Sequence, residues 1–166
     1  MKTCVFAGTF DPPTNGHKSV VDRALKIFDR VTVAVAVNTQ KSCLFTREER
    51  LKLLGELFGD DKRVKVRAFD GTVVDLLKEE NTPFYVRGVR DCIDFEYENR
   101  DRYASERLDG DIITIYLPAP QEQLHVSSTL IRNSVRFEKD YESYIPKEIL
   151  DTLKKMLEAK DVHKAD

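Results

Sequence analysis

The sequence predicts an α/β fold, an open five-stranded parallel sheet with helices on both faces. Five short apolar segments that favour β-structure alternate with segments of helical periodicity. Residues 31–37 are apolar at nearly every position, as expected of a central parallel strand covered on both faces. No linker, repeat or low-complexity segment divides the 166 residues. We therefore expect a single domain over residues 1–166, with a core over 1–135 and a C-terminal helical segment over 136–160.

The first two strands are each followed by a helix with a recognisable start. The first strand ends at Gly8, and residues 14–15 are suitable caps for the helix that follows the loop. The second strand leads through a polar loop to Thr46 and Glu49, which have the spacing of a capping box. This second helix is expected to end at residues 59–61.

Three further strands are predicted after the second helix. Residues 64–69 alternate between apolar and polar side chains, which favours a strand nearer the edge of the sheet. Residues 84–86 form a buried fourth strand, and a long charged helix follows from residue 91 or 94 to about residue 108. Residues 112–117 form the fifth strand.

The C-terminal part of the chain is predicted to be helical after an irregular loop over residues 118–125. Ser127 or Ser128 would cap a short helix. Pro146 suits the first turn of a final amphipathic helix that carries Leu150, Leu153 and Leu157.

Composition excludes several classes of function. The formal net charge is −2, so no bulk basic field attracts nucleic acid, and no nucleic-acid partner is expected. No apolar run approaches the ~20 residues that span a bilayer, and the N-terminus lacks a signal-peptide layout, so no membrane partner is expected. Cys4, Cys43 and Cys92 match neither a metal pattern nor a disulfide framework. We expect a reducing cytoplasm, with all three thiols as packing residues.

The polar residues that stand out in the sequence all follow predicted strands. Right-handed crossovers bring such loops to one edge of a parallel sheet, where ligands bind. Gly88 would allow close backbone approach to a ligand, and His17, Lys41, Arg87 and Arg90 are four potential cations on one rim. Guanidinium and ammonium groups together suit several phosphates. In strand order, the residues at this edge are Thr9 and His17, Lys41, residues 71–73, Arg87 and Arg90, and residues 127–129.

Residues 8–17, with the sequence GTFDPPTNGH, resemble the T/H-x-G-H signature of the nucleotidyltransferase superfamily. The resemblance is greatest to the phosphopantetheine adenylyltransferase family, and it covers nearly the whole chain. Residues 46–50 are similar to that family's T-x-E-E-R segment, and residues 87–90 to its R-G-[LV]-R segment. Residues 94–98 are similar to its D-[FY]-E-Y-E segment, and residues 126–129 to its I-S-S-[ST] motif. The chain departs from the family at Ala7, Pro13, Ser42, Ser105 and residues 123–125.

The resemblance implies a Rossmann-like fold and a defined reaction. Adenylate would pass from ATP to 4′-phosphopantetheine, giving dephospho-coenzyme A and pyrophosphate in coenzyme A biosynthesis. The acceptor phosphate would attack the α-phosphorus in line, with no covalent enzyme intermediate. Mg²⁺ would be held mainly by the nucleotide and water, without protein ligands. The resemblance also implies a homohexamer, with dephospho-coenzyme A, and coenzyme A as product or inhibitor, as further bound molecules.

The resemblance also implies roles for individual residues. His17 would stabilise the transition state, and Lys41 and Arg90 would act with it in catalysis. Thr9, Lys41, Val73 and Arg87 would hold phosphopantetheine. Glu98 would face the ribose or adenine, because a carboxylate beside the triphosphate is repulsive. The residues implied to contact ATP are Thr9, Phe10, His17, Gly88, Val89, Arg90, Glu98, Gln123, Leu124, His125, Val126, Ser127, Ser128 and Thr129.

Two other functions stay open at this point. One is another nucleotidyltransferase of the same fold, such as a cytidylyltransferase or a mononucleotide adenylyltransferase. The segments at residues 87–90 and 94–98 argue against it. The other is a regulatory protein that binds nucleotide without turnover, which the joint presence of Thr9, His17, Lys41 and Arg90 disfavours. The sequence by itself does not fix the oligomeric state.

Overall fold

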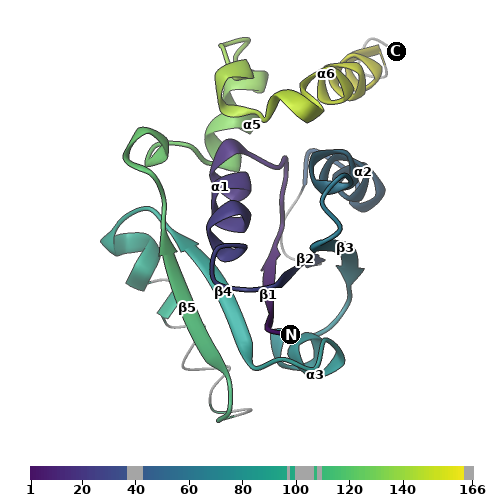
Figure 1. Cartoon of the computed structure of the whole chain (residues 1–166). Coiled ribbons are helices and arrows are strands. Elements are labelled where there is room, and N and C mark those ends of the chain that lie inside the picture. Colours follow the sequence, from purple (N-terminus) through teal and green to yellow (C-terminus); the bar gives the residue numbers. More distant parts are fainter. Residues whose placement is uncertain (37–42, 97, 100–106, 108–109, 163–166) are drawn as a thin grey trace.

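A five-stranded parallel sheet forms the centre of the molecule (Figure 1). The computed structural model describes residues 1–36, 43–96, 98–99, 107 and 110–162. Neighbouring strands are parallel throughout this sheet, so the predicted Rossmann-like α/β class is confirmed. The strands are β1 (Thr3–Gly8), β2 (Arg30–Ala36), β3 (Val64–Phe69), β4 (Phe84–Val89) and β5 (Ile113–Pro118).

The strand order β3-β2-β1-β4-β5 creates a point where the direction of winding reverses. The chain moves outward from β1 to β3, which lies at an edge as predicted, and then returns to the other side of β1. Loops that leave neighbouring strands at such a reversal point turn away from each other, which opens a crevice at their carboxyl ends. β1 pairs with β2 from Thr3 to Gly8, whereas its pairing with β4 joins Val5 and Tyr85. The fold therefore predicts a binding site between the ends of β1 and β4.

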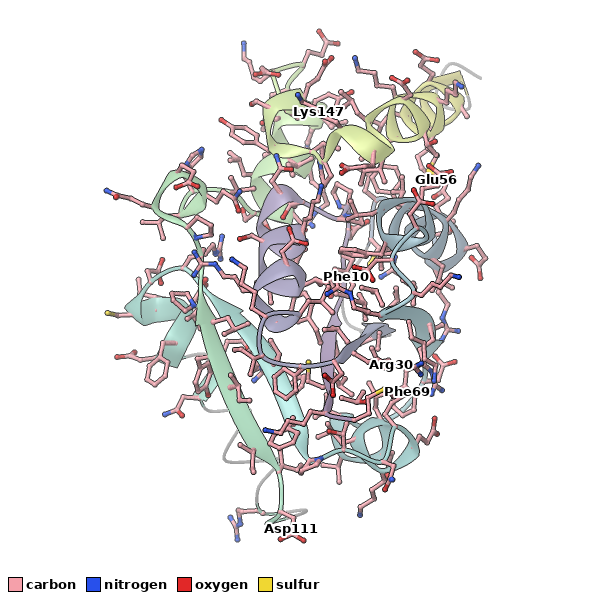
Figure 2. The ribbon with its side chains drawn as sticks, in the orientation of Figure 1. Phe10, Arg30, Glu56, Phe69, Asp111 and Lys147 are labelled. Carbon is pink, nitrogen blue, oxygen red and sulfur yellow. The ribbon has the colours of Figure 1, made fainter. Side chains whose placement is uncertain are left out.

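Helices cover both faces of the sheet. Val74, Leu76 and Leu77 of α3 pack with Val5 and Tyr85 on one face. The larger core on the other face contains buried residues of α1, α2, α5 and α6 (Figure 2). Among the described residues, no helix is long and apolar enough to cross a membrane. The helices are α1 (Asn15–Ala24), α2 (Arg47–Phe58), α3 (Val73–Glu79), α5 (Ser128–Arg136) and α6 (Lys147–Val162), with short 3₁₀ turns η1 (Gln121–Gln123) and η2 (Glu142–Tyr144).

The structure corrects several predicted boundaries. β4 continues to Val89, so Arg87 and Gly88 lie in the strand and not in the loop after it. Arg87 pairs with Tyr116 and Gly88 with Leu117 of β5, and this pairing overrides the weak strand preference of Arg-Gly. β5 and α6 each begin one residue later than predicted. Of the long helix expected from residue 91 or 94 to about 108, residues 92–96, 98–99 and 107 are helical, and the rest lies outside the described residues.

The cysteines also differ from the prediction that all three are packing residues. Cys4 is buried in the core, but Cys92 is exposed and Cys43 is partly exposed. Cys92 lies at the start of the helical segment at residue 92, on the molecular surface. The packing role is therefore wrong for Cys92.

Candidate active site

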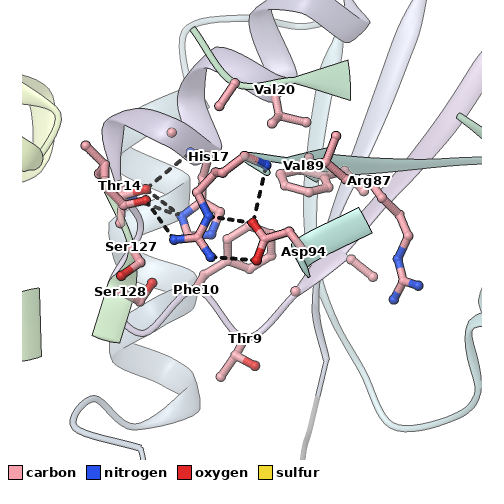
Figure 3. Close-up of a pocket in the computed structure, with 18 of the residues that line it drawn as sticks. Thr9, Phe10, Thr14, His17, Val20, Arg87, Val89, Asp94, Ser127 and Ser128 are labelled. Carbon is pink, nitrogen blue, oxygen red and sulfur yellow. Dashed lines mark hydrogen bonds and ion pairs between the residues drawn. The ribbon is translucent and has the colours of Figure 1, made fainter. Parts of the chain in front are cut away.

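A cavity of about 870 Å³ opens at the carboxyl ends of β1 and β4, at the reversal point of the sheet (Figure 3). Five stretches of sequence line it: β1 with the following loop and α1, the end of β2 with Cys43, the start of α3, β4 with the helical segment after it, and the segment from Ala119 into α5. The structure thus brings residues from five separate parts of the sequence to one site. The predicted site residues that line it are Thr9, Phe10, His17, Val73, Arg87, Gly88, Val89, Arg90, Glu98, Gln123, Val126, Ser127, Ser128 and Thr129.

Three predicted site residues are not among those that line the cavity. Lys41 lies outside the described residues. The Leu124 side chain is exposed, and the His125 ring packs against Tyr144 with ring centroids 5.4 Å apart. The roles of these three residues toward the substrates stay predictions.

His17 is held at the start of α1 by a reciprocal capping box. The hydroxyl of Thr14, the N-cap residue, accepts a hydrogen bond from the His17 backbone amide at 3.3 Å. In return, His17 Nδ1 accepts one from the Thr14 backbone amide at 3.0 Å. Because Nδ1 is an acceptor, the proton of the neutral ring lies on Nε2. The cap therefore leaves His17 with one ring N–H to donate.

The His17 imidazole is neutral near pH 7. Burial, and then the positive charge of Arg90, lower the pKa of His17 to about 4. The Phe10 ring packs edge-on against the imidazole, with centroids 4.9 Å apart, and contributes to this desolvation. The prediction that His17 is one of four cations on the rim is therefore wrong. His17 offers a hydrogen-bond donor, while the arginines supply the positive charge.

The two arginines of β4 and the following turn are each paired with a carboxylate. Arg90 donates from Nε and NH2 to the two carboxylate oxygens of Asp94, at 2.6 and 2.9 Å. This pairing raises the pKa of the Arg90 guanidinium. Arg87 forms an ion pair with Glu98, donates to the Glu98 backbone oxygen at 2.8 Å and lies over the Tyr85 ring. These carboxylates reduce the positive charge of the rim and fix the direction of both guanidinium groups.

These pairs change the interpretation of two acidic residues. Glu98 was expected to face ribose or adenine, but its side chain pairs with Arg87. Sequence reasoning missed Asp94, which lies four residues after Arg90, inside the helical segment that begins at residue 92. The four-residue spacing of these opposite charges is the sequence signal that could have found it.

The loop before α5 and its first turn form the opposite wall of the cavity. Ser127 caps α5 by accepting a hydrogen bond from the Leu130 amide at 3.0 Å. Ser128 donates to the Pro12 backbone oxygen at 2.8 Å, which ties this wall to the loop after β1. Arg132 donates to Thr129 Oγ1 and to the Asp11 backbone oxygen. Two helix starts, of α1 and α5, therefore face the cavity, a suitable environment for phosphate groups.

Gly88 has a packing role that the sequence did not reveal. A Cβ at this position would lie 2.6 Å from Val20 Cγ2 on α1. Glycine therefore lets α1 approach β4 closely, and this approach brings His17 and Arg90 together. The expected close approach to a ligand is compatible with this role, since Gly88 also lines the cavity.

The carboxylates that line the cavity have partners of their own. Asp94 and Glu98 pair with arginines, and Asp11 accepts hydrogen bonds from two backbone amides. Within the described part of the chain, no group of three or more His, Cys, Asp or Glu side chains is placed to hold a metal ion. The donor set at this site therefore suits anions better than a protein-bound cation.

Comparison with known proteins identifies the family. A model of the cytidylyltransferase-like family matches residues 5–134. A phosphopantetheine adenylyltransferase of Clostridium beijerinckii is 37% identical over 153 residues, which cover 92% of this chain and 96% of the relative. That of Campylobacter jejuni is 44% identical over 152 residues, with the same coverage of 92% and 96%. That of an Anaeromyxobacter species is 36% identical and covers 94% and 95%.

A solved structure with the same fold supports the assignment. It is a crystal structure assigned to a nicotinate-nucleotide adenylyltransferase of Vibrio parahaemolyticus, with a TM-score of 0.65 and 26% identity. The match covers 92% of this chain and 99% of that chain. Together with the cavity at the reversal point, these similarities show that the chain is a nucleotidyltransferase of the cytidylyltransferase-like family and belongs with the phosphopantetheine adenylyltransferases.

Proposed function

We propose that this enzyme transfers adenylate from ATP to 4′-phosphopantetheine, giving dephospho-coenzyme A and pyrophosphate in coenzyme A biosynthesis. The observation that carries the proposal is the neutral His17 at the start of α1, beside Arg90 and opposite the start of α5. This group of donors surrounds a space in which a triphosphate can be bound at several oxygens. The choice of phosphopantetheine as the acceptor is supported by the names of the relatives.

The proposed reaction is a direct displacement at the α-phosphorus of ATP. An oxygen of the acceptor phosphate forms a bond to this phosphorus, and the bond to the β-phosphate oxygen breaks. Pyrophosphate leaves with the electron pair, and no covalent enzyme intermediate forms. His17 Nε2–H donates to an α-phosphate oxygen as negative charge develops on it, and Arg90 stabilises the leaving pyrophosphate. Catalysis then comes from alignment and from donors fixed before the reaction.

The two substrates would use different walls of the cavity. ATP would contact the loop before α5, together with Gly88, Val89 and Arg90. The acceptor would contact Thr9, Val73 and Arg87, with Lys41 at its phosphate. Glu98 would act on the acceptor side through Arg87, because the two side chains are paired.

ATP would enter as its Mg²⁺ complex. Mg²⁺ keeps several waters and few protein ligands in such sites, and it would neutralise part of the triphosphate charge. The cavity carboxylates already have partners, so the nucleotide and water are the expected ligands. This assignment predicts that turnover requires Mg²⁺ while the fold does not.

The oligomeric state and the compartment belong to the same proposal. We expect a homohexamer that acts in the cytoplasm and that binds dephospho-coenzyme A, and coenzyme A, as product or inhibitor. Light scattering on the purified chain tests the hexamer, and a monomer at micromolar concentration would contradict it.

A substrate panel tests the reaction itself. Pyrophosphate release is measured with ATP or CTP as donor, and with 4′-phosphopantetheine or nicotinate mononucleotide as acceptor. Release with ATP and 4′-phosphopantetheine alone is the expected result. Release with nicotinate mononucleotide would support the second candidate, a mononucleotide adenylyltransferase, which the Vibrio structure favours. ATP binding without release on any acceptor would instead indicate a nucleotide-sensing protein.

A further inference from the structure

Two buried ionised side chains near the cavity have no part in the proposed transfer. Asp11 is 2% exposed, and Arg50 is 6% exposed. Taking a charged group out of water is unfavourable unless hydrogen bonds or an opposite charge stabilise it. The partners of these two side chains therefore show what each of them holds in place.

Asp11 lies in the loop after β1, and its carboxylate binds the segment that leads into α2. Oδ2 accepts a hydrogen bond from the Leu44 amide at 2.9 Å, and Oδ1 accepts one from the Phe45 amide at 2.8 Å. Arg132 adds positive charge, with NH1 3.7 Å from Oδ2. Phe45 is itself 1% exposed, so the segment that Asp11 binds is anchored in the core.

Arg50 makes the reverse connection, from α2 back to the loop after β1. Its NH1 donates to the Thr9 backbone oxygen at 2.7 Å, and its Nε donates to the Thr46 backbone oxygen at 3.2 Å. Charge-assisted hydrogen bonds thus join the two segments in both directions. Thr9 and Cys43, which belong to the joined segments, both line the cavity.

We infer that Asp11 and Arg50 are positioning residues, which fix the acceptor side of the cavity by bonding the loop after β1 to the start of α2. The inference rests on the proposed function, in which Thr9 faces the acceptor. Most of the nucleotide side is built from other elements, β4 and the start of α5. Loss of the Asp11 bonds should therefore impair use of the acceptor and leave ATP binding nearly unchanged.

Asp11→Asn is the first test. An amide has one accepting oxygen, and its NH₂ group would face the other backbone amide, so both original bonds cannot persist. We expect kcat/KM for 4′-phosphopantetheine to fall by about tenfold, and the dissociation constant for ATP to change less than about twofold. The Leu44 and Phe45 amides should exchange hydrogen faster than in the wild type. Asp140→Asn is the control, because Asp140 also accepts a hydrogen bond from a backbone amide, that of Glu142 at the start of η2, at 3.0 Å and away from the cavity.

Arg50→Lys is the second test and serves also if Asp11→Asn does not fold. Lysine keeps the charge but cannot bond the Thr9 and Thr46 backbone oxygens with the same geometry. We therefore expect kcat/KM for 4′-phosphopantetheine to fall as in Asp11→Asn, while ATP binding stays nearly unchanged. An equal loss for both substrates, or faster exchange with unchanged acceptor kinetics, would overturn the inference. If the wild type releases no pyrophosphate, the proposed function fails. In that case, calorimetry of 4′-phosphopantetheine binding to the wild type and to the variants, together with their amide exchange rates, tests the positioning role without any need for turnover.

Discussion

His17 has two roles at the scale of the single residue, because its two ring nitrogens face different partners. Nδ1 accepts the Thr14 amide and completes the cap of α1, which fixes the ring. Nε2 carries the proton that can be donated to a phosphate oxygen. A ring that is already neutral and oriented needs no reorganisation during the reaction, and this is the condition under which a donor lowers a barrier most.

Replacing His17 by Ala is expected to lower kcat far more than it weakens ATP binding. Loss of one transition-state donor of this kind typically reduces the rate by about 10²–10³. His17→Gln is the matched control, since Gln at this position can still reach back to the N-cap amide and preserve the cap. Steady-state kinetics and calorimetry with ATP measure the two effects. Near wild-type turnover with altered ATP affinity would make His17 a binding residue.

His17 also makes stability depend on pH in a defined window. Its pKa is lowered from 6.5 to about 4 in the folded protein. As the pH falls from about 6.5 to about 4, the unfolded chain binds a proton at this residue that the folded chain does not. The free energy of unfolding therefore decreases across this window, by on the order of 3 kcal/mol from this group, and levels off below it.

Urea unfolding at several pH values between 4 and 7 measures this effect as the difference between wild type and His17→Gln. Other groups titrate equally in both proteins, so the difference isolates His17. The variant should lose less stability than the wild type as the pH falls. Parallel profiles would show that the pKa of His17 is not lowered.

Lys41→Ala is expected to impair the reaction mainly through phosphopantetheine. Lys41 lies outside the described residues, and the prediction rests on its place after the second strand and on the family resemblance. A charge-assisted contact to phosphate contributes roughly 1.5–3 kcal/mol, so the acceptor-side loss should be at least about tenfold. Kinetics with each substrate varied in turn, and calorimetry with ATP, test this. The control is Lys62→Ala, an exposed lysine before β3. An equal loss for both substrates would exclude Lys41 from the acceptor site.

At the scale of elements, the sequence predicts helix starts well and strand ends less well. The capping box of α2 involves Thr46 and Glu49, three residues apart, and the structure confirms both of its bonds. The cap of α1 at Thr14 is equally local. The end of β4 was predicted too early, because Arg87 and Gly88 continue the strand through pairing with β5, a distant segment. Local patterns determine caps, whereas strand ends depend on neighbours.

Gly88→Ala is expected to separate α1 from β4. Val20 is β-branched and has little rotamer freedom in a helix, so it cannot easily move from the added Cβ at 2.6 Å. Overpacking of this kind costs about 1–3 kcal/mol and should also lower activity, since it displaces His17 relative to Arg90. Urea unfolding and pyrophosphate release measure both effects.

Two further variants control for the effect of the methyl group itself. Gly55→Ala adds a methyl group in α2, where nothing lies within 4 Å, and should stabilise the protein by about 0.5–1 kcal/mol. Val20→Ala combined with Gly88→Ala should recover most of the lost activity because the clash is removed. No recovery in the double variant would show that the Val20 contact is not the cause.

At the scale of the whole molecule, the alternating pattern was enough to predict the sheet and the edge at which the site lies. It could not predict the connections that complete the site. Asp11 and Leu44 are 33 residues apart, and Asn15 of α1 donates to the backbone oxygen of Ser143, 128 residues later. Such contacts depend on the final packing of elements and leave no periodic signal. The same holds for the bond from Arg132 of α5 to the Asp11 backbone oxygen, which joins two walls of the cavity.

The C-terminal helix α6 belongs to the same buried core as α1, α2 and α5. Leu153 and Ile149 of α6 are fully buried and pack in one cluster with Leu53 and Leu54 of α2. Lys160 of α6 also pairs with Glu49, at 2.8 Å, and lies over the Phe45 ring. This packing predicts that α6 and the sheet unfold together.

Leu153→Ala tests whether the molecule unfolds as one unit. Truncation of a fully buried Leu typically costs about 2–5 kcal/mol, since it removes apolar contacts and leaves a cavity. If α6 is part of one cooperative core, the free energy of unfolding falls by this amount and a single unfolding transition remains. The calorimetric and van't Hoff enthalpies of that transition should then be equal at a fixed protein concentration. Lys155→Ala, an exposed change on the same helix, should alter stability by less than about 0.5 kcal/mol. A second transition in Leu153→Ala, with the main one unmoved, would show that α6 unfolds on its own.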